Sequence, residues 1–201
     1  MSDLERALAD IGAIRAQMAR GAAFHGLGPT AFAATGVLAA LAAFGQALWT
    51  QTPTAAAPFL TLWMTVAAIS GVVIVGEMIG RSRRLHSDLA DELIAAATWQ
   101  FMPAGVAGGL ITLVLARFAP QSLWMAPGLW QICYGLGVFA SCRFLPRAMP
   151  VVGAWYVASG LGALALAQGP LAFSPWTMGV GFGVGQLLVA AVLRFAEPAD
   201  V

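Results

Sequence analysis

Residues 174–195 read SPWTMGVGFGVGQLLVAAVLRF, an apolar run in which Arg194 is the single charge. A helix rises about 1.5 Å per residue, so a run of this length reaches across a hydrocarbon core of about 30 Å. The run therefore predicts a transmembrane helix. Further apolar runs of similar length lie at about 30–50, 58–80, 98–117, 123–142 and 148–168.

The composition agrees with a membrane setting. Of the 201 residues, 60% are hydrophobic and 9% are charged, whereas a soluble domain carries about 25% charged residues. The long unbroken runs differ from the alternating segments of about ten residues that build a β-barrel. We therefore expect an all-α integral membrane protein. Its parts are an N-terminal amphipathic helix and linker at 1–29, one six-helix transmembrane bundle at 30–196, and a tail at 197–201.

Arginine placement predicts the orientation. All ten basic residues are Arg, and a six-span layout puts nine of them on one side and leaves Arg117 on the other. The positive-inside rule then makes both termini cytoplasmic. The acidic start MSDLERALAD lacks the features of a cleavable signal peptide, so the first span is expected to direct insertion. The Ala- and Gly-rich, Lys-free composition is compatible with a bacterium, and we expect an inner-membrane protein. The net charge of +1 gives no sign of a nucleic-acid partner.

Glycines dominate residues 177–186, TMGVGFGVGQ. The letters VGFG match the end of a potassium-channel selectivity filter, but about ten residues follow before Arg194, or ~15 Å of helix, too short for an inner pore helix. Spacing at 100° per residue instead produces two interleaved GxxxG motifs on nearly opposite faces, which favour close helix packing. Flexibility for gating is the alternative interpretation. The glycines predicted to pack helices are Gly179 and Gly183, Gly181 and Gly185, Gly76 and Gly80, and Gly105 and Gly109.

Catalytic and metal-binding motifs are missing from the sequence. It contains no GxSxG nucleophile elbow, HExxH zinc site or Walker loop. His25 and His86 both flank the spans, so paired axial ligation of a haem within the membrane is not available. Cys133 and Cys142 are nine residues apart, which puts them on opposite faces of one helix. We expect no enzyme activity, no metal and no cofactor.

Glu77 is the one acidic residue inside a predicted span. An intramembrane carboxylate is a candidate proton or cation site. Arg81 follows four residues later, however, and an ion pair at this spacing near the end of the helix explains Glu77 as a structural anchor. The anchor is the favoured interpretation.

Four polar residues are predicted near the middle of the bilayer, each roughly 16 to 18 Å from the end of its segment at about 1.5 Å per residue. They are Ser70, Tyr134, Ser159 and Gln186. Such residues commonly form hydrogen bonds between helices. If their side chains converge, they would instead provide the polar groups of a small-molecule pocket in an apolar cavity.

An amphipathic helix is predicted at about residues 3–20. Ser2 and Glu5 form a capping box, and an apolar stripe follows. The stripe lacks the aromatic anchors and dense basic residues of a membrane-surface helix. We expect it to dock on its own bundle, on a second copy or on a protein partner, through Leu4, Leu8, Ile11 and Met18.

Two functions follow from these observations. The favoured one is a non-enzymatic scaffold or regulatory membrane protein that docks a partner or a second copy through its cytoplasmic face. The alternative is a small-solute transporter or membrane substrate-binding subunit with a pocket in mid-membrane. The spans hold almost no charge, and ion-coupled transport sites usually need some.

Overall fold

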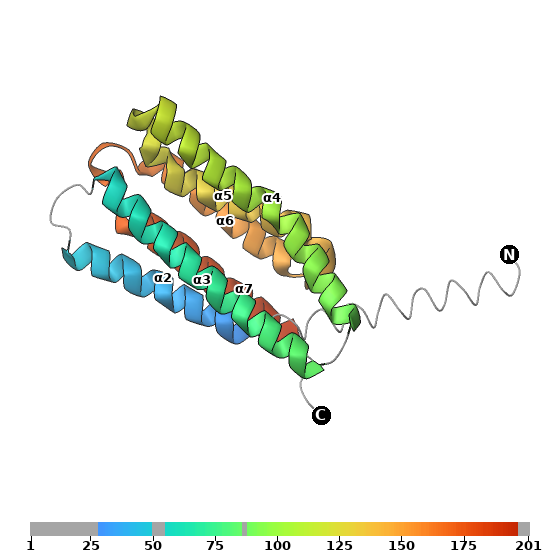
Figure 1. Cartoon of the computed structure of the whole chain (residues 1–201). Helices are drawn as coiled ribbons and strands as arrows, with labels where there is room; N and C mark the ends of the chain where they lie inside the picture. Colours follow the sequence, from blue (N-terminus) through green and yellow to red (C-terminus); the bar gives the residue numbers. More distant parts are fainter. Residues whose placement is uncertain (1–27, 50–54, 86–87, 197–201) are drawn as a thin grey trace, which may run out of the picture.

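A computed structural model describes residues 28–49, 55–85 and 88–196, and these ranges form helices joined by short turns (Figure 1). The predicted N-terminal amphipathic helix, with its docking residues, lies outside them. The α-helices are α2 Pro29–Trp49, α3 Ala56–Leu85, α4 Asp88–Phe118, α5 Ala126–Ser141, α6 Met149–Leu166 and α7 Pro175–Ala196. Three short 3₁₀ segments are η1 Pro120–Met125, η2 Cys142–Phe144 and η3 Gly169–Leu171.

Prolines mark the beginnings of four helices. Pro29 and Pro175 are the first residues of α2 and α7, and Pro127 and Pro150 lie in the first turns of α5 and α6. Proline suits these positions because its φ is already helical and the first turn does not use its missing N–H. Each proline therefore helps to set where an apolar run becomes helical.

The α6–α7 turn contains two residues with left-handed backbone conformations. Gly169 has φ of 58°, which costs glycine little, and Phe173 has φ of 59°. For a residue with a Cβ this conformation is strained, so contacts with neighbouring residues must stabilise it. The Phe173 ring packs against Phe59 of α3, with 5.2 Å between ring centroids. That contact fastens the turn to the beginning of α3.

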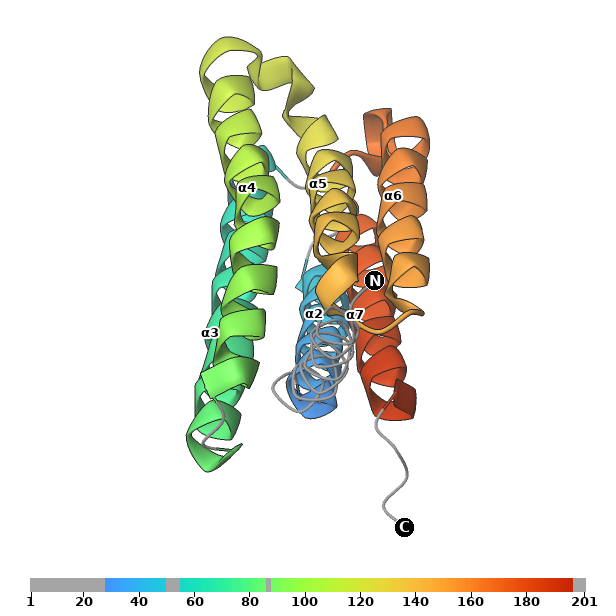
Figure 2. The same ribbon diagram turned by 90° about the vertical axis from the view of Figure 1, so that its right-hand side faces the viewer.

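The helices form two layers. Helices α2, α3 and α7 make one layer, and α4, α5 and α6 make the other (Figure 1). The layers meet where α7 packs on α6 and α5. At the opposite edge lie α3 and α4, as the turned view shows (Figure 2), and these two helices are barely in contact. The bundle is thus closed along one edge and loosely joined along the other.

Two buried clusters hold the layers. One surrounds Tyr156 and Leu193 between α6 and α7, and the other surrounds Phe59 and Trp63 where α3 meets α2 and α7. Within the second cluster the buried Trp63 donates its indole N–H to Gln46 Oε1 of α2 at 3.0 Å. Between helices in a membrane, such close packing and hydrogen bonding stabilise the association, since lipid tails are as apolar as the side chains. This cluster is the main attachment of the first half of α3.

The helices support the multi-pass membrane class. Five of the described helices are long and apolar enough to cross a membrane: α2, α3, α4, α6 and α7. The predicted span at 123–142 differs, because its α-helical part, α5, has 16 residues and is preceded by the separate 3₁₀ segment η1. At 1.5 Å per residue α5 extends about 24 Å. Helices α3 and α4 also run beyond their predicted spans at their adjoining ends, to Leu85 and from Asp88.

Candidate functional site

A cavity of about 560 Å³ lies between the two layers. Its walls come from α2, α3, α4, α5 and α7, with single contributions from Leu145 in the α5–α6 turn and Met149 of α6. The size falls within the 300–1,000 Å³ range of small-molecule sites. The cavity exists because α3 and α4 stand apart while the other helices pack.

The cavity opens at the α3–α4 edge. Met64 and Val75 of α3 line it and are 56% and 46% exposed. The lining residues of α5 and α7 are buried or half-buried, with Val138 6% and Val189 4% exposed. The mouth is therefore lateral, between two helices, and the floor is formed by α5 and α7.

The lining is apolar and uncharged. No Asp, Glu, Lys, Arg or His is among the described residues that line the cavity. Six aromatic side chains contribute to the walls: Phe32, Trp63, Phe101, Trp130, Tyr134 and Phe182. An ion placed here would lose its hydration without gaining a countercharge, which is costly. The cavity is chemically suited to a neutral, mainly apolar molecule.

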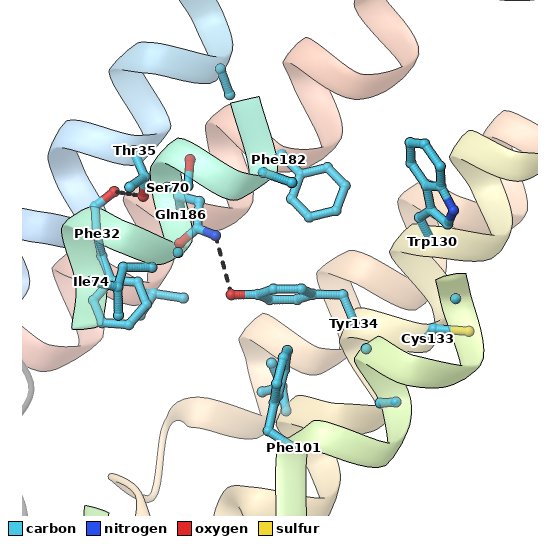
Figure 3. A pocket seen from close by; sticks show the side chains of 18 of the residues that line it. Phe32, Thr35, Ser70, Ile74, Phe101, Trp130, Cys133, Tyr134, Phe182 and Gln186 are labelled. Atoms are coloured by element: carbon cyan, nitrogen blue, oxygen red, sulfur yellow. Dashed lines mark hydrogen bonds between the residues drawn. The ribbon is translucent and has the colours of Figure 1, made fainter. Parts of the chain in front are cut away.

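Tyr134 and Gln186 meet on the floor of this cavity (Figure 3). The Gln186 amide Nε2 donates to the Tyr134 hydroxyl at 3.1 Å. The Tyr134 ring lies between Phe101 and Phe182, with centroid distances of 4.9 and 5.5 Å and near-perpendicular planes. The amide oxygen Oε1 of Gln186 is buried and has no hydrogen-bond partner among the described residues. The pair is a polar point within aromatic walls.

Two other polar lining groups are satisfied within the protein. Thr35 donates to the Phe32 carbonyl at 2.9 Å. Thr112 donates to the Gly108 carbonyl at 2.9 Å and accepts from the Trp130 indole at 2.7 Å. Helix-interior threonines commonly bond to the preceding turn in this way. These two groups therefore have less to offer a ligand than Tyr134 and Gln186.

The structure brings three of the four predicted pocket residues to one cavity: Ser70, Tyr134 and Gln186 all line it. Ser159 does not. It lines a second, shallower cavity of about 380 Å³ between α6 and α7, and its hydroxyl donates to the Tyr156 carbonyl at 3.2 Å. Counting residues from the end of a span predicts depth, but the rotation of the helix decides which way a side chain points.

Glu77 and Arg81 lie outside the cavity lining. Arg81 Nε is 3.2 Å from Glu77 Oε1, as the spacing predicts. Glu77 also accepts a hydrogen bond from the backbone N–H of Ala31 at 2.7 Å and one from the Thr30 hydroxyl. Both donors belong to the first turn of α2, where unpaired N–H groups and the helix dipole favour a carboxylate. Glu77 thus fastens α3 to the start of α2.

The α7 glycines face different neighbours. Gly179 and Gly183 lie against α2, at Ala43 and at Gly36, while Gly181 meets the Gln131 amide of α5 and Gly185 meets the Tyr156 ring of α6. A Cβ at Gly179, Gly181 or Gly185 would collide with these groups.

The glycines of α3 and α4 behave differently. A Cβ at Gly76, Gly80, Gly105 or Gly109 would meet no described atom within 4 Å. Gly105 and Gly109 line the cavity, together with Gly71 of α3. Within the described chain these positions bound open space, and any helix packing against them stays a prediction.

Sequence inspection missed the aromatic side chains of the floor. Phe101 and Phe182 carry no signal because apolar residues fill every span, and Cys133, which lines the cavity, reads as a small buried residue. Both cysteines are free. Among the described residues no group of three His, Cys, Asp or Glu could hold a metal ion. No protein-family model, curated protein or solved structure matches the chain.

Proposed function

We propose that this chain is a multi-pass membrane protein that binds a small, neutral, mainly apolar molecule in the cavity between α3 and α4. The observation that carries the proposal is the cavity itself: uncharged, aromatic-walled, about 560 Å³, open at one edge, with a single paired polar point on its floor. Ligand sites commonly combine apolar walls with a few placed polar groups. The role is binding, in a carrier or a membrane substrate-binding subunit, without a chemical step.

The proposal includes six membrane crossings. Five helices have the length to cross. Helix α5 returns from the end of α4 to the beginning of α6 and packs along both (Figure 2). If α6 crosses the membrane, α5 must cross in the opposite direction to deliver the chain to its start. An even number of crossings puts both termini on one side, and the arginine distribution assigns that side to the cytoplasm.

A membrane setting explains the position of the mouth. The exposed apolar side chains on both sides of it, such as Met64, Val75 and Val106, suit contact with acyl chains. A lateral opening between two spanning helices then faces the hydrocarbon region. Lipid-soluble molecules would reach the floor directly from the bilayer.

The scaffold function predicted from the sequence stays a second candidate. The uncovered glycines Gly76 and Gly80 on α3 favour it, because small residues four apart let another helix approach. The cavity favours binding, since a scaffold has no need of a hollow that costs packing energy.

Two glycines of α3 provide a matched test. Gly71 lines the cavity and Gly76 does not, and a Cβ at either position meets no described atom within 4 Å. We expect native mass spectrometry of the wild-type chain with added methyl oleate, a neutral lipid-like probe, to give a one-to-one complex. Gly71→Phe should weaken it at least about tenfold, because the ring would occupy the mouth, and a tenfold loss is about 1.4 kcal/mol.

Gly76→Phe is the control and should bind like the wild type. Equal binding by both variants would contradict the cavity as the site, as would a wild-type chain that forms no complex. A loss in both variants together with loss of helicity would mark unfolding, and the smaller pair Gly71→Leu and Gly76→Leu would then decide.

A further inference from the structure

The Tyr134–Gln186 pair has more hydrogen-bond donors than it uses. The pair holds three donor hydrogens, two on the Gln186 amide nitrogen and one on the Tyr134 hydroxyl. Its one hydrogen bond engages one of them. If the amide were turned over, Tyr134 would donate to the amide oxygen and both amide hydrogens would lack partners. In either orientation donors are left over on the floor of the cavity. Turning the amide over also gives Gln186 Oε1, which otherwise has no described partner, a hydrogen bond from Tyr134.

Leftover donors are costly in an apolar cavity. A buried polar group without a partner loses about 1–3 kcal/mol of solvation that a partner would restore. The described rings around Tyr134 are those of Phe101, Phe182 and Tyr156, and aromatic rings accept hydrogen bonds poorly. A ligand that brings an acceptor oxygen would restore the missing bond.

A charge on the ligand would weaken its binding in this cavity. The nearest described ion pair, Glu77 with Arg81, is outside the lining, and no charged side chain reaches into the cavity. A carboxylate could accept the Tyr134 hydrogen but would lie without a countercharge in aromatic surroundings. The cost of burying an unpaired ion exceeds the gain from one hydrogen bond.

We propose that the ligand class is a neutral lipid-soluble molecule whose polar part is an acceptor oxygen, such as an ester, a ketone or a quinone carbonyl, and that this oxygen meets the Tyr134–Gln186 pair. This inference rests on the proposed function, since it assigns the chemistry of the same cavity. The aromatic rings around Tyr134 favour a flat conjugated or carbonyl-bearing head over a bulky one. The tail lies along the apolar walls toward the α3–α4 mouth.

The test compares probes with similar long chains and different heads: methyl oleate, octadecene, oleate and oleylammonium. The readout is the modification rate of Cys133, a lining residue, by N-ethylmaleimide in the full-length chain. Cys142 is free, does not line the cavity, and is the internal control. Methyl oleate should protect Cys133 at the lowest concentration, with octadecene about two- to tenfold weaker for want of one hydrogen bond. Both charged probes should be weaker than methyl oleate.

The double variant Tyr134→Phe with Gln186→Leu removes every donor of the pair and so separates the hydrogen bond from the shape of the cavity. It should make methyl oleate and octadecene equally protective. Tyr156→Phe removes a buried hydroxyl outside the lining and should leave their ratio unchanged. If the double variant lowers helicity, the single variants Tyr134→Phe and Gln186→Leu should each lower the ratio in part, since each leaves donors on the other residue.

The outcomes separate the inference from the function it rests on. Charged and neutral probes that protect Cys133 equally, or a ratio that survives the double variant unchanged or is unaffected by both single variants, would overturn the assigned ligand chemistry while binding in the cavity stands. No protection of Cys133 by any probe would overturn binding in the cavity and the ligand class together.

Discussion

At the residue scale, the α7 glycines allow neighbouring helices to pack where a side chain would collide with them. Gly181 leaves room for the buried Gln131 amide, whose Nε2 donates to the Thr177 carbonyl of α7 at 3.0 Å. Gly183, two residues later, faces Gly36 with ordinary van der Waals spacing, since a Cβ there would be 3.6 Å from the Gly36 carbonyl oxygen. Two neighbouring glycines of the interleaved motifs therefore have different tolerance to substitution.

This difference gives a paired stability prediction. Gly181→Ala should destabilise the bundle by about 1–2 kcal/mol, because overpacking costs about 1–3 kcal/mol and the gain in helix propensity offsets up to about 1. Gly183→Ala should be neutral or stabilising by up to about 1 kcal/mol, since only the propensity changes. Unfolding of both variants in a denaturing detergent titration measures the difference. Equal stabilities, or a less stable Gly183→Ala, would contradict the described packing of α7.

At the element scale, α3 is attached to the bundle at two places. Near its start Phe59 and Trp63 are buried against α2, α7 and the Phe173 turn. Near its end Glu77 caps the first turn of α2. Between these attachments α3 contributes Ser70, Gly71 and Ile74 to the cavity wall. The wall of the cavity is thus a helix attached mainly at these two places, with Ile74 packed against the α6–α7 cluster between them.

Glu77 is therefore expected to act in stability and not in proton transfer. Glu77→Ala should destabilise the fold by about 1–2 kcal/mol, since it removes a helix cap and an ion pair near a helix N-terminus. Thr30→Val, which removes one of the donors to Glu77, should cost less. Detergent unfolding measures both. A Glu77→Ala variant as stable as the wild type would show that the cap contributes nothing.

The elements were largely predictable, whereas the site was only partly so. Long apolar runs mark the helices because a helix that crosses the hydrocarbon core must be apolar along its length. Prolines mark where helices begin because proline suits the first turn. Ser70, Tyr134 and Gln186 could be grouped because depth follows from position along a helix. Two features depend on the rotation of the helices relative to each other: Ser159 lies outside the main cavity, and Glu77 caps α2. No local sequence pattern predicts that rotation. The gap between α3 and α4 likewise results from helix packing, and the apolar sequences of these two helices do not predict it.

At the scale of the whole molecule, the two-layer arrangement and the chain direction predict a topology. In a Cys-free background, cysteines placed at Gln121 and Gln168 should react with a membrane-impermeant maleimide added outside. A cysteine at Arg147, in the α5–α6 turn, should react only from the cytoplasmic side, together with positions in 82–90. Labelling of the cysteines at Gln121, Arg147 and Gln168 from the same side would show that α5 and α6 do not cross and would contradict six spans. Labelling of Arg147→Cys alone from outside would contradict the orientation.

The most direct test of the central proposal, that the α3–α4 cavity binds a lipid-soluble molecule, is an experimental structure of the full-length chain in a lipid bilayer disc. The predicted result is non-protein density that enters between α3 and α4 and ends beside the Tyr134 hydroxyl and the Gln186 amide. Density of this kind should disappear in Gly71→Phe. A structure in which α3 rests directly on α4, with the space between them filled by their own side chains, would contradict the proposal.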